Sequence, residues 1–334
     1  MTPTTHHPVD QSTDRPADSP KTGFPPRLLA SSWGQASPRG RPRKQRPDPR
    51  LEPGHSSPEA PCALAWRQPG ADRAWRGVVL VIHGLNLKPE RMDGLVAELL
   101  AMDMAVLRLS LRGHGRNYVP RPGWSPARAR LASFQAVNYG LWRAETYAAF
   151  CICRNVSQMA HVPLYLVAFS LGGLLACELA ASGLVRFDGM VLLAPALRIR
   201  SWCRILQPVT PFPKLVIPSL SPPYYRANPG TPMAAYGALY QGLARLDRLL
   251  PGNPPGLQVP TLLWVDPDDE FVSYRGLRAL QATSACRRWK LVPVQKSARA
   301  FPAYHHLIVD PAAVGGATWT AMVAQMRAHL LGRA

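Results

Sequence analysis

The hydrophobic residues of this chain form short apolar runs that alternate with longer segments of helical spacing. Six runs have the length and composition of buried strands, and they cover residues 77–82, 104–109, 163–169, 189–194, 260–265 and 290–294. The segments between and after them repeat apolar residues every three or four positions, which predicts helices over 89–102, 127–160 (broken or bent), 171–181 and 317–331. Strands that alternate with helices form parallel βαβ units. The pattern therefore predicts an α/β fold with a doubly wound, mostly parallel sheet.

Residues 198–259 interrupt this alternation. They are rich in proline and aromatic residues, and one stretch within them, 233–250, has good helical spacing. In an open parallel sheet, ligands bind at the carboxyl ends of the strands. An insertion between two core strands above that edge would cover a ligand, so we expect 198–259 to form a cap or lid.

The first 61 residues differ in composition from the rest of the chain. They hold thirteen of the 36 prolines, together with many Ser, Thr, Asp and Arg residues, and they show no apolar period. Such a segment cannot bury enough apolar surface to offset its chain entropy. We expect residues 1–61 to be a disordered tail with a solvated basic cluster at 39–46, and residues 62–334 to form the folded domain.

The sequence shows no apolar signal segment near its start. One stretch, 162–185, is long and apolar enough to suggest a membrane span, but it contains Ser170, Glu178 and three glycines. A buried strand, a turn and a buried helix explain this stretch better than a membrane span does. We therefore expect a cytoplasmic protein.

The net charge of +19 favours anionic partners such as a phospholipid surface, nucleic acid or an acidic substrate. However, the basic residues are nearly all arginine and are scattered, without the aromatic residues that accompany them in nucleic-acid-binding motifs. We expect no specific nucleic-acid binding, and peripheral contact with an anionic membrane at most. The six cysteines lack paired zinc-site spacing, so the sequence predicts neither a metal nor a cofactor. It does not indicate an oligomeric state.

Residues 164–175 give the strongest local signal, because an apolar strand enters a small-x-Ser-x-Gly turn and a helix leaves it. This is the setting of a nucleophile elbow, in which a tight turn holds a serine hydroxyl clear of the sheet. Bulky side chains beside the serine would clash where helix and strand approach, and Ala168 and Gly172 keep these positions small. The pattern predicts Ser170 as a nucleophile. The alternative is a strand–helix junction with an incidental serine.

A serine nucleophile needs a general base and a carboxylate that orients the base. The fifth predicted strand is followed by the acidic segment 266–272, and the sixth is followed by a segment that contains His305 and His306. The chain order is therefore serine, then aspartate, then histidine. Because the carboxyl ends of parallel strands meet at one edge of a sheet, these side chains can converge on Ser170.

On these motifs, the chain from about residue 77 to its end resembles the α/β-hydrolase superfamily, especially capped bacterial esterases and monoacylglycerol-lipase-like enzymes. The matching motifs are the His83-Gly84 pair after the first core strand, the R-G-H-G loop at 112–115, the Ser170 elbow and the two later segments. The resemblance implies a sheet of the α/β-hydrolase type with a cap. It also implies that Ser170 is the nucleophile and that the N–H groups of Leu85 and Leu171 form the oxyanion hole.

The resemblance also ranks the acid and the base. Relatives usually read G-x-x-D-x-x-V after the acid strand, which puts Asp266 in the glycine position and makes Asp269 the acid, with Asp268 as the alternative. It favours His305 as the base, with His306 as the alternative if the loop is framed one residue later.

Two further histidines of the folded domain are expected to have structural roles. His83, with Gly84, would shape the oxyanion turn, and His114 would pack a loop. The chain departs from the family pattern at Ala168 and Asp266, where relatives carry glycine, and at Ser110, where relatives often carry aspartate. None of these departures removes a catalytic group.

These features predict a serine hydrolase that cleaves a carboxylic ester through a Ser-His-Asp triad and an acyl-enzyme, without a metal or cofactor. The apolar, aromatic insertion and the basic surface favour a lipid-type acyl ester as the substrate. The alternatives are an acyltransferase, a thioesterase or a C–C bond hydrolase that uses the same triad, and a non-catalytic binding module with the hydrolase fold.

Overall fold

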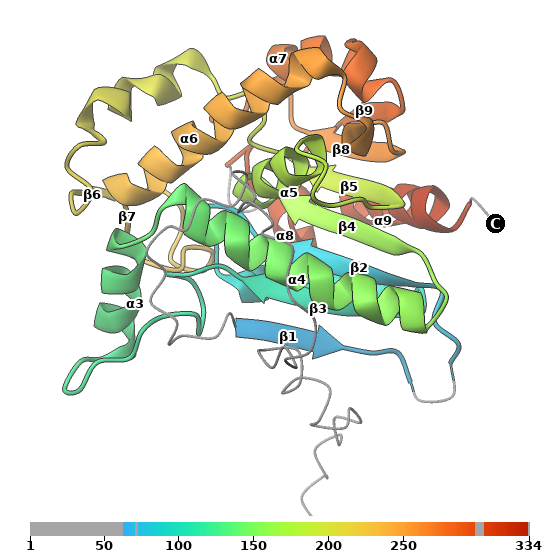
Figure 1. The fold of residues 1–334 in the computed structure, drawn as a ribbon, viewed down its shortest axis with the longest axis horizontal. Coiled ribbons are helices and arrows are strands. Elements are labelled where there is room, and N and C mark those ends of the chain that lie inside the picture. Colours follow the sequence, from blue (N-terminus) through green and yellow to red (C-terminus); the bar gives the residue numbers. More distant parts are fainter. Residues whose placement is uncertain (1–62, 71–72, 298–303, 333–334) are drawn as a thin grey trace, which may run out of the picture. The chain divides into compact units, whose positions relative to one another are not determined.

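The computed structural model describes residues 63–70, 73–297 and 304–332, so the predicted disordered tail at 1–61 lies outside the described residues. The main sheet has seven strands in the order β1-β3-β2-β4-β5-β8-β9 (Figure 1). The strands are β1 (Ala63–Arg67), β2 (Gly77–Ile82), β3 (Met104–Ser110), β4 (Leu164–Phe169), β5 (Gly189–Leu193), β8 (Thr261–Val265) and β9 (Trp289–Pro293). All neighbouring pairs are parallel except β1 and β3. The predicted α/β fold with a mostly parallel sheet is confirmed.

The six predicted strands all occur, and each of their ends agrees within one residue. The sequence analysis missed β1, which pairs antiparallel with β3 at the edge of the sheet. Its sequence, A-L-A-W-R, is short and has no β-branched residue, and Leu64 and Trp66 are only partly buried. A strand of this kind forms because it completes the edge of an existing sheet, and its own pattern gives little sign of it.

The helices of the predicted segments all occur, with one break. The helices of the described residues outside 198–259 are η1 (Pro89–Met92), α2 (Asp93–Leu100), α3 (Pro126–Gln135), α4 (Tyr139–Met159), α5 (Leu171–Ala181), α7 (Tyr274–Gln281), η5 (Ser284–Cys286), α8 (Pro311–Val314) and α9 (Gly316–Leu331). Of these, α7, η5 and α8 are additional elements that the sequence analysis did not predict. The predicted helix over 127–160 is two helices, because the Asn138 side chain accepts a hydrogen bond from the Leu141 N–H (2.8 Å) and begins α4 anew. Likewise, Ser125 caps the N-terminus of α3, with Pro126 in its first turn.

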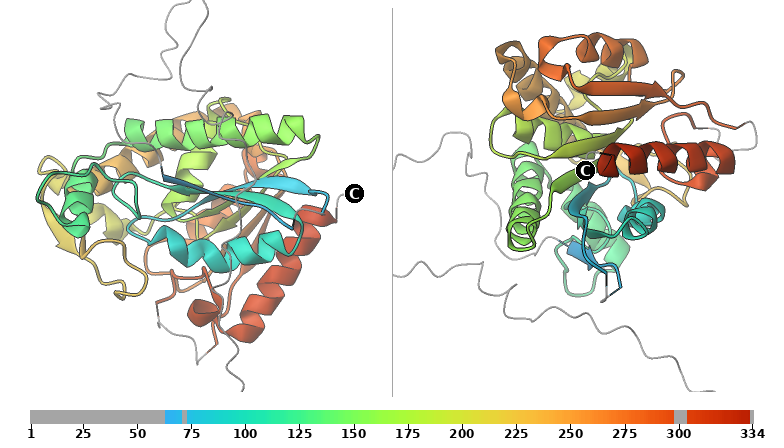
Figure 2. Two further views of the ribbon diagram at one scale, coloured as in Figure 1. Left: turned by 90° about the horizontal axis from the view of Figure 1, so that it is seen from below. Right: turned by 90° about the vertical axis from the view of Figure 1, so that its right-hand side faces the viewer.

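The two faces of the sheet are covered by different helices (Figure 2). Along β2, Val78, Leu80 and Ile82 pack in the cluster that contains residues of α4 and α5, whereas Val79 and Val81 pack in the cluster that contains residues of α2 and α9. This is the period of two expected of a strand buried on both faces. The sheet is therefore the middle layer of three.

The order of the strands places a topological switch between β2 and β4. The chain runs from β2 to β3 on one side and then returns to β4 on the other side of β2. Loops at the carboxyl ends of these strands leave in opposite directions, which opens a crevice suited to a ligand. The turn after β2 contains Leu85 and the turn after β4 contains Ser170, so both predicted groups lie at this switch.

Residues 198–259, the insertion segment, connect β5 to β8. Within the insertion segment lie η2 (Ser201–Val209), β6 (Val216–Pro218), β7 (Gly230–Pro232), α6 (Met233–Leu249), η3 (Leu250–Gly252) and η4 (Pro255–Leu257). Helix α6 matches the predicted helix and packs against α4 and α5. Among the described helices, none combines the length and apolarity needed to cross a bilayer.

Candidate active site

Ser170 lies in the strained turn that the elbow motif predicts. Its backbone angles are φ 50° and ψ −114°, outside the regions that L-residues ordinarily occupy. Such a conformation costs about 1–3 kcal/mol and persists only where its surroundings enforce it. Here the Ser170 N–H donates to the Leu193 carbonyl (3.0 Å), and the Ser170 carbonyl accepts from the Ala196 N–H (3.0 Å). The strand β5 and the loop after it therefore hold the turn.

Small residues around Ser170 allow the helix and the neighbouring loop to approach it. A Cβ atom on Gly172 would lie 2.6 Å from the Ile82 carbonyl oxygen, and one on Gly84 would lie 3.0 Å from the Ser170 Cβ. The Gly172 contact is too close for any side chain, and a Cβ atom on Gly84 would also lie only 2.6 Å from the Phe169 ring. Ala168 is fully buried in β4, so a methyl group fits at the position where relatives carry glycine.

A chain of hydrogen bonds joins Ser170 to a histidine and an aspartate. The Nε2 atom of His306 lies 3.0 Å from the Ser170 Oγ, and its Nδ1 atom lies 2.8 Å from Oδ2 of Asp269. Asp269 is fully buried, and its Oδ1 accepts from the N–H groups of Phe271 (2.8 Å) and Val272 (2.7 Å). The carboxylate therefore has a single orientation, with one oxygen on the backbone and the other on the imidazole.

The preference for His305 is corrected by this geometry, because the alternative residue His306 faces Ser170. The His305 ring is 42% exposed, and its Nδ1 lies 2.9 Å from Oδ2 of Asp266. That hydrogen bond raises the pKa of His305 above its ordinary value. The two rings bind different aspartates, so only one histidine can serve the serine. The preferred acid, Asp269, is in place, whereas the alternative Asp268 is exposed.

The Ser170–His306–Asp269 arrangement suits proton transfer from a hydroxyl group. If Nδ1 of His306 donates to Asp269, then Nε2 is an acceptor and can take the Ser170 proton. The carboxylate would stabilise the imidazolium that forms. The ring of His306 is held between Phe169 and Phe271, at centroid distances of 5.0 and 5.2 Å. Few alternative orientations are open to it.

The loop after β2 is held by two buried, neutral histidines. The Nδ1 of His83 donates to the Gly84 carbonyl (2.8 Å), and its Nε2 accepts from the Leu111 N–H (3.0 Å). His114 accepts from the N–H of Asn86, the residue directly after Leu85 (3.0 Å). Burial lowers the pKa of His83 to about 4 and that of His114 well below its ordinary range. The structural roles expected of both residues agree with these contacts.

The buried His83 predicts a specific loss of stability in acid. Its pKa is about 4 in the folded chain, against 6.5 for a free histidine, so the unfolded chain binds more protons between these values. The stabilising contribution is present above pH 6.5 and is lost as the pH falls toward 4. At pH 5 this one group lowers the free energy of unfolding by about 2 kcal/mol relative to pH 7. Urea unfolding at both pH values measures the difference.

Two variants isolate that effect from the titration of carboxylates. His83→Gln removes the titrating group, so its unfolding free energy should depend less on pH than that of the wild type. His161→Gln changes an exposed histidine and should keep the wild-type dependence. If all three proteins lose the same free energy between pH 7 and pH 5, His83 does not cause the loss.

The two unusual residues of the flanking loops have partners in the structure. Asp266, at the position where relatives carry glycine, accepts from the Asp268 N–H (2.9 Å) as well as binding His305. Ser110, where relatives often carry aspartate, donates through Oγ to the His114 carbonyl (3.0 Å). Both therefore stabilise the loops that they occupy.

Among the described residues, one cluster has the donor types of a metal site. Asp266, Asp268 and His305 offer ligand atoms that lie within 4.8 Å of one another. However, both oxygens of Asp266 already accept protein hydrogen bonds, one of them from the His305 ring. Their hydrogen bonds account for this arrangement without an ion.

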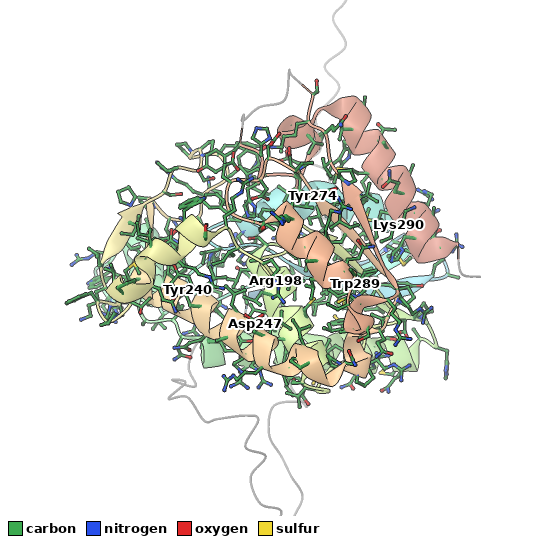
Figure 3. The ribbon with its side chains drawn as sticks, turned by 90° about the horizontal axis from the view of Figure 1, so that it is seen from above. Arg198, Tyr240, Asp247, Tyr274, Trp289 and Lys290 are labelled. Atoms are coloured by element: carbon green, nitrogen blue, oxygen red, sulfur yellow. The ribbon has the colours of Figure 1, made fainter. Side chains whose placement is uncertain are left out.

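The insertion segment is joined to the elements that carry the site. Arg245 of α6 (3.2 Å) and Arg143 of α4 (2.8 Å) both bind the fully buried carboxylate of Glu178 on α5. At the start of the segment, Arg198 pairs with Asp247 of α6 (2.7 Å; Figure 3). A hollow of about 450 Å³ beside this pair is lined by none of the residues that bind Ser170.

Sequence reasoning missed two groups of residues here. Glu178 stands out as a lone acid in the apolar helix 171–181, which is a signal for a buried ion pair. Glu270 accepts hydrogen bonds from the backbone N–H groups of both His305 and His306 (2.9 Å each). It lies inside the acidic segment, and nothing in the spacing distinguishes it from its neighbours.

The comparisons with known proteins bear on the fold of the chain. A family model described as serine aminopeptidase, S33, matches residues 73–235. That range includes Ser170 and the loop after β2, whereas Asp269 and His306 lie beyond it. None of the curated proteins compared matches the chain.

Several solved structures share the fold. One, from work on the metagenome-derived lipolytic enzymes LipS and LipT, is 20% identical with a TM-score of 0.62, covering 81% of this chain and 97% of that one. A soluble variant of monoglyceride lipase from Saccharomyces cerevisiae, in complex with a substrate analog, is 14% identical (TM-score 0.61; 81% and 92% covered). A monoacylglycerol lipase from Paleococcus ferrophilus is 18% identical (TM-score 0.55; 80% and 99% covered). At these identities the likeness establishes the fold.

Proposed function

We propose that the chain is a serine hydrolase of the α/β-hydrolase superfamily and that it cleaves carboxylic esters. The observation that carries this proposal is the hydrogen-bonded series of Ser170 Oγ, His306 and Asp269, with distances of 3.0 and 2.8 Å. An isolated serine hydroxyl is a weak nucleophile, and this arrangement is the one that activates it.

The mechanism assigns one role to each of these residues. His306 takes the Ser170 proton as Oγ attacks the acyl carbonyl, and Asp269 stabilises the resulting imidazolium. The tetrahedral intermediate collapses as His306 gives the proton to the leaving alcohol, which leaves an acyl-enzyme on Ser170. Water, deprotonated by His306, then releases the acid and restores the serine.

The oxyanion is assigned to the N–H groups of Leu171 and Leu85. Leu171 is the first residue of α5, so its N–H has no acceptor within the helix. Gly84 lies against Ser170, and the hydrogen bond between the Asn86 N–H and His114 fixes the far side of the same loop. Fixed donors of this kind are worth about 3–4 kcal/mol each in the transition state.

The insertion segment supports an apolar acyl chain as the substrate. Large apolar side chains are exposed on it, and they include Trp202 (52%), Ile205 (74%), Phe212 (66%) and Leu220 (79%). Exposed apolar groups gathered in one segment are typical of surfaces that meet lipid or a partner. Exposed basic residues at 204 and 214 lie among them in the sequence, which favours an anionic lipid surface. We therefore propose a lipid-type ester, presented at such a surface.

Labelling with a fluorophosphonate tests the enzymatic proposal. The folded chain should be modified stoichiometrically, peptide mass spectrometry should place the adduct on Ser170, and heat-unfolded chain should remain unmodified. The same preparation should hydrolyse a series of acyl esters and prefer long chains in vesicles that contain an anionic lipid. Absence of labelling would favour a non-catalytic binding module, and activity on short soluble esters alone would contradict the lipid assignment.

Further substrates separate the other chemistries that this triad supports. Added alcohol or coenzyme A should not divert the acyl group, because diversion would indicate an acyltransferase. An acyl thioester, a C–C hydrolase substrate and an aminoacyl anilide should react more slowly than the oxygen ester. A faster reaction with one of them would replace the ester as the substrate class.

A further inference from the structure

Glu270 bonds to the main chain of both histidines in the candidate site. Its Oε1 accepts from the His305 N–H and its Oε2 accepts from the His306 N–H, both at 2.9 Å. The preceding residue, Asp269, binds the ring of His306. Consecutive acidic residues therefore fix the backbone and the side chain of the same histidine.

The histidine segment depends on side chains for this support. His305 and His306 lie in a turn outside the helices and strands, so no sheet or helix ladder satisfies their N–H groups. A buried or half-buried N–H group needs an acceptor, and a carboxylate provides a stronger one than a carbonyl. The two N–H groups bind different oxygens of one planar carboxylate. That carboxylate therefore fixes the positions of both groups relative to each other.

Glu270 is itself anchored by the insertion segment. Its carbonyl accepts from the indole N–H of Trp202 (3.0 Å), and the next carbonyl, that of Phe271, accepts from the Arg200 N–H (2.8 Å). Strand pairing between Ile199 and Val272 continues this contact. The loop that carries the Glu270 carboxylate is therefore held in place by its hydrogen bonds to the insertion segment.

From these contacts we propose that Glu270 is a positioning residue, whose carboxylate holds the backbone of His306 so that Nε2 faces the Ser170 hydroxyl. This inference rests on the proposed function, because it concerns the same site. A misplacement of about 1 Å between reacting groups can cost about a hundredfold in rate, so the loss of this support should appear in kcat. The Glu270 carboxylate is bonded to the backbone N–H groups of His305 and His306, so its loss should change KM little.

The test uses Glu270→Gln, which keeps the shape of the side chain but replaces one acceptor oxygen with an NH₂ group. We expect kcat per active site to fall about tenfold to a hundredfold, the range for loss of one charge-assisted hydrogen bond. Active sites are counted by the endpoint of fluorophosphonate labelling. Poorly folded molecules are therefore not counted as enzyme when kcat is calculated. Glu270→Ala, which lacks both acceptors, should fall further.

Asp268→Asn is the matched control. It removes a negative charge from the same loop, but Asp268 is exposed, and only its backbone N–H makes a hydrogen bond that the structure records. Its kcat per active site should equal that of the wild type. If Glu270→Gln also equals the wild type, or if only KM changes, Glu270 does not position the base.

An NMR measurement separates this inference from the proposed function. The His306 Nδ1 proton, held by Asp269, should resonate at low field and be identified by its absence from His306→Ala. In Glu270→Gln that resonance should shift or broaden, and in Asp268→Asn it should not. An unchanged resonance overturns the positioning role even if no ester is hydrolysed, whereas a changed one supports it.

Discussion

Replacement of His306 with alanine is expected to lower kcat/KM by roughly 10⁵- to 10⁶-fold, because it removes the only imidazole that contacts the Ser170 hydroxyl among the described residues. Replacement of the adjacent His305 is expected to change kcat/KM by less than about threefold, since its ring binds Asp266 at the partly exposed side of the loop. The two variants are neighbours in the chain and lose the same group of atoms. Both variants therefore have the same amino-acid composition, and a difference between their activities reports the position of each imidazole in the site.

Alanine at either position keeps the backbone N–H that Glu270 accepts, so neither variant disturbs the support of the loop. Steady-state kinetics on one ester, with circular dichroism to confirm folding, measures the effect. Fluorophosphonate labelling should slow in parallel for His306→Ala. Loss of activity in His305→Ala with retention in His306→Ala would contradict the arrangement.

The choice between these two histidines could not be predicted from the sequence pattern. Spacing places a segment after a strand, and the strand places it at an edge of the sheet, so His305 and His306 were both found. Adjacent residues of a turn direct their side chains to different places, and that direction depends on backbone angles set by contacts such as those of Glu270. No periodicity records those angles.

The elbow, in contrast, could be predicted well from its residues alone. Its small residues are needed because the helix and the neighbouring backbone lie very close to the turn, as the contact of Gly172 with Ile82 shows. Only a few positions are involved. The strand boundaries were also accurate, because buried parallel strands are continuous apolar runs. The edge strand β1 depends on a long-range partner, so it left little local signal. The lone acid Glu178 is visible in the sequence, but its partners Arg143 and Arg245 are far from it in the chain.

The acid is the second position where a small chemical change should have a large effect. Asp269→Asn is expected to lower kcat/KM by about 10⁴-fold while the fold is kept. The new amide side chain can leave its carbonyl oxygen on the N–H groups of Phe271 and Val272, which bind Oδ1 of Asp269 in the wild type. Its NH₂ group then faces Nδ1 of His306, where the carboxylate oxygen accepts a hydrogen bond in the wild type.

A donor facing Nδ1 favours the tautomer of His306 that carries its proton on Nε2. That atom lies against the Ser170 hydroxyl, and a protonated nitrogen cannot accept the serine proton. The defect is therefore one of tautomer rather than of packing, and the melting temperature should change little. Asp268→Asn, which places the same amide one residue earlier on the loop, should keep full activity.

The pH dependence separates this explanation from a general weakening of the site. As the pH rises, hydroxide can remove the proton of the Ser170 hydroxyl without help from His306. The residual activity of Asp269→Asn should therefore increase in alkaline solution. A variant that lost activity through a misfolded loop would show no such recovery. Retention of more than about a tenth of the wild-type kcat/KM at neutral pH would remove Asp269 from its assigned role, because a correctly oriented general base contributes at least ~10²-fold.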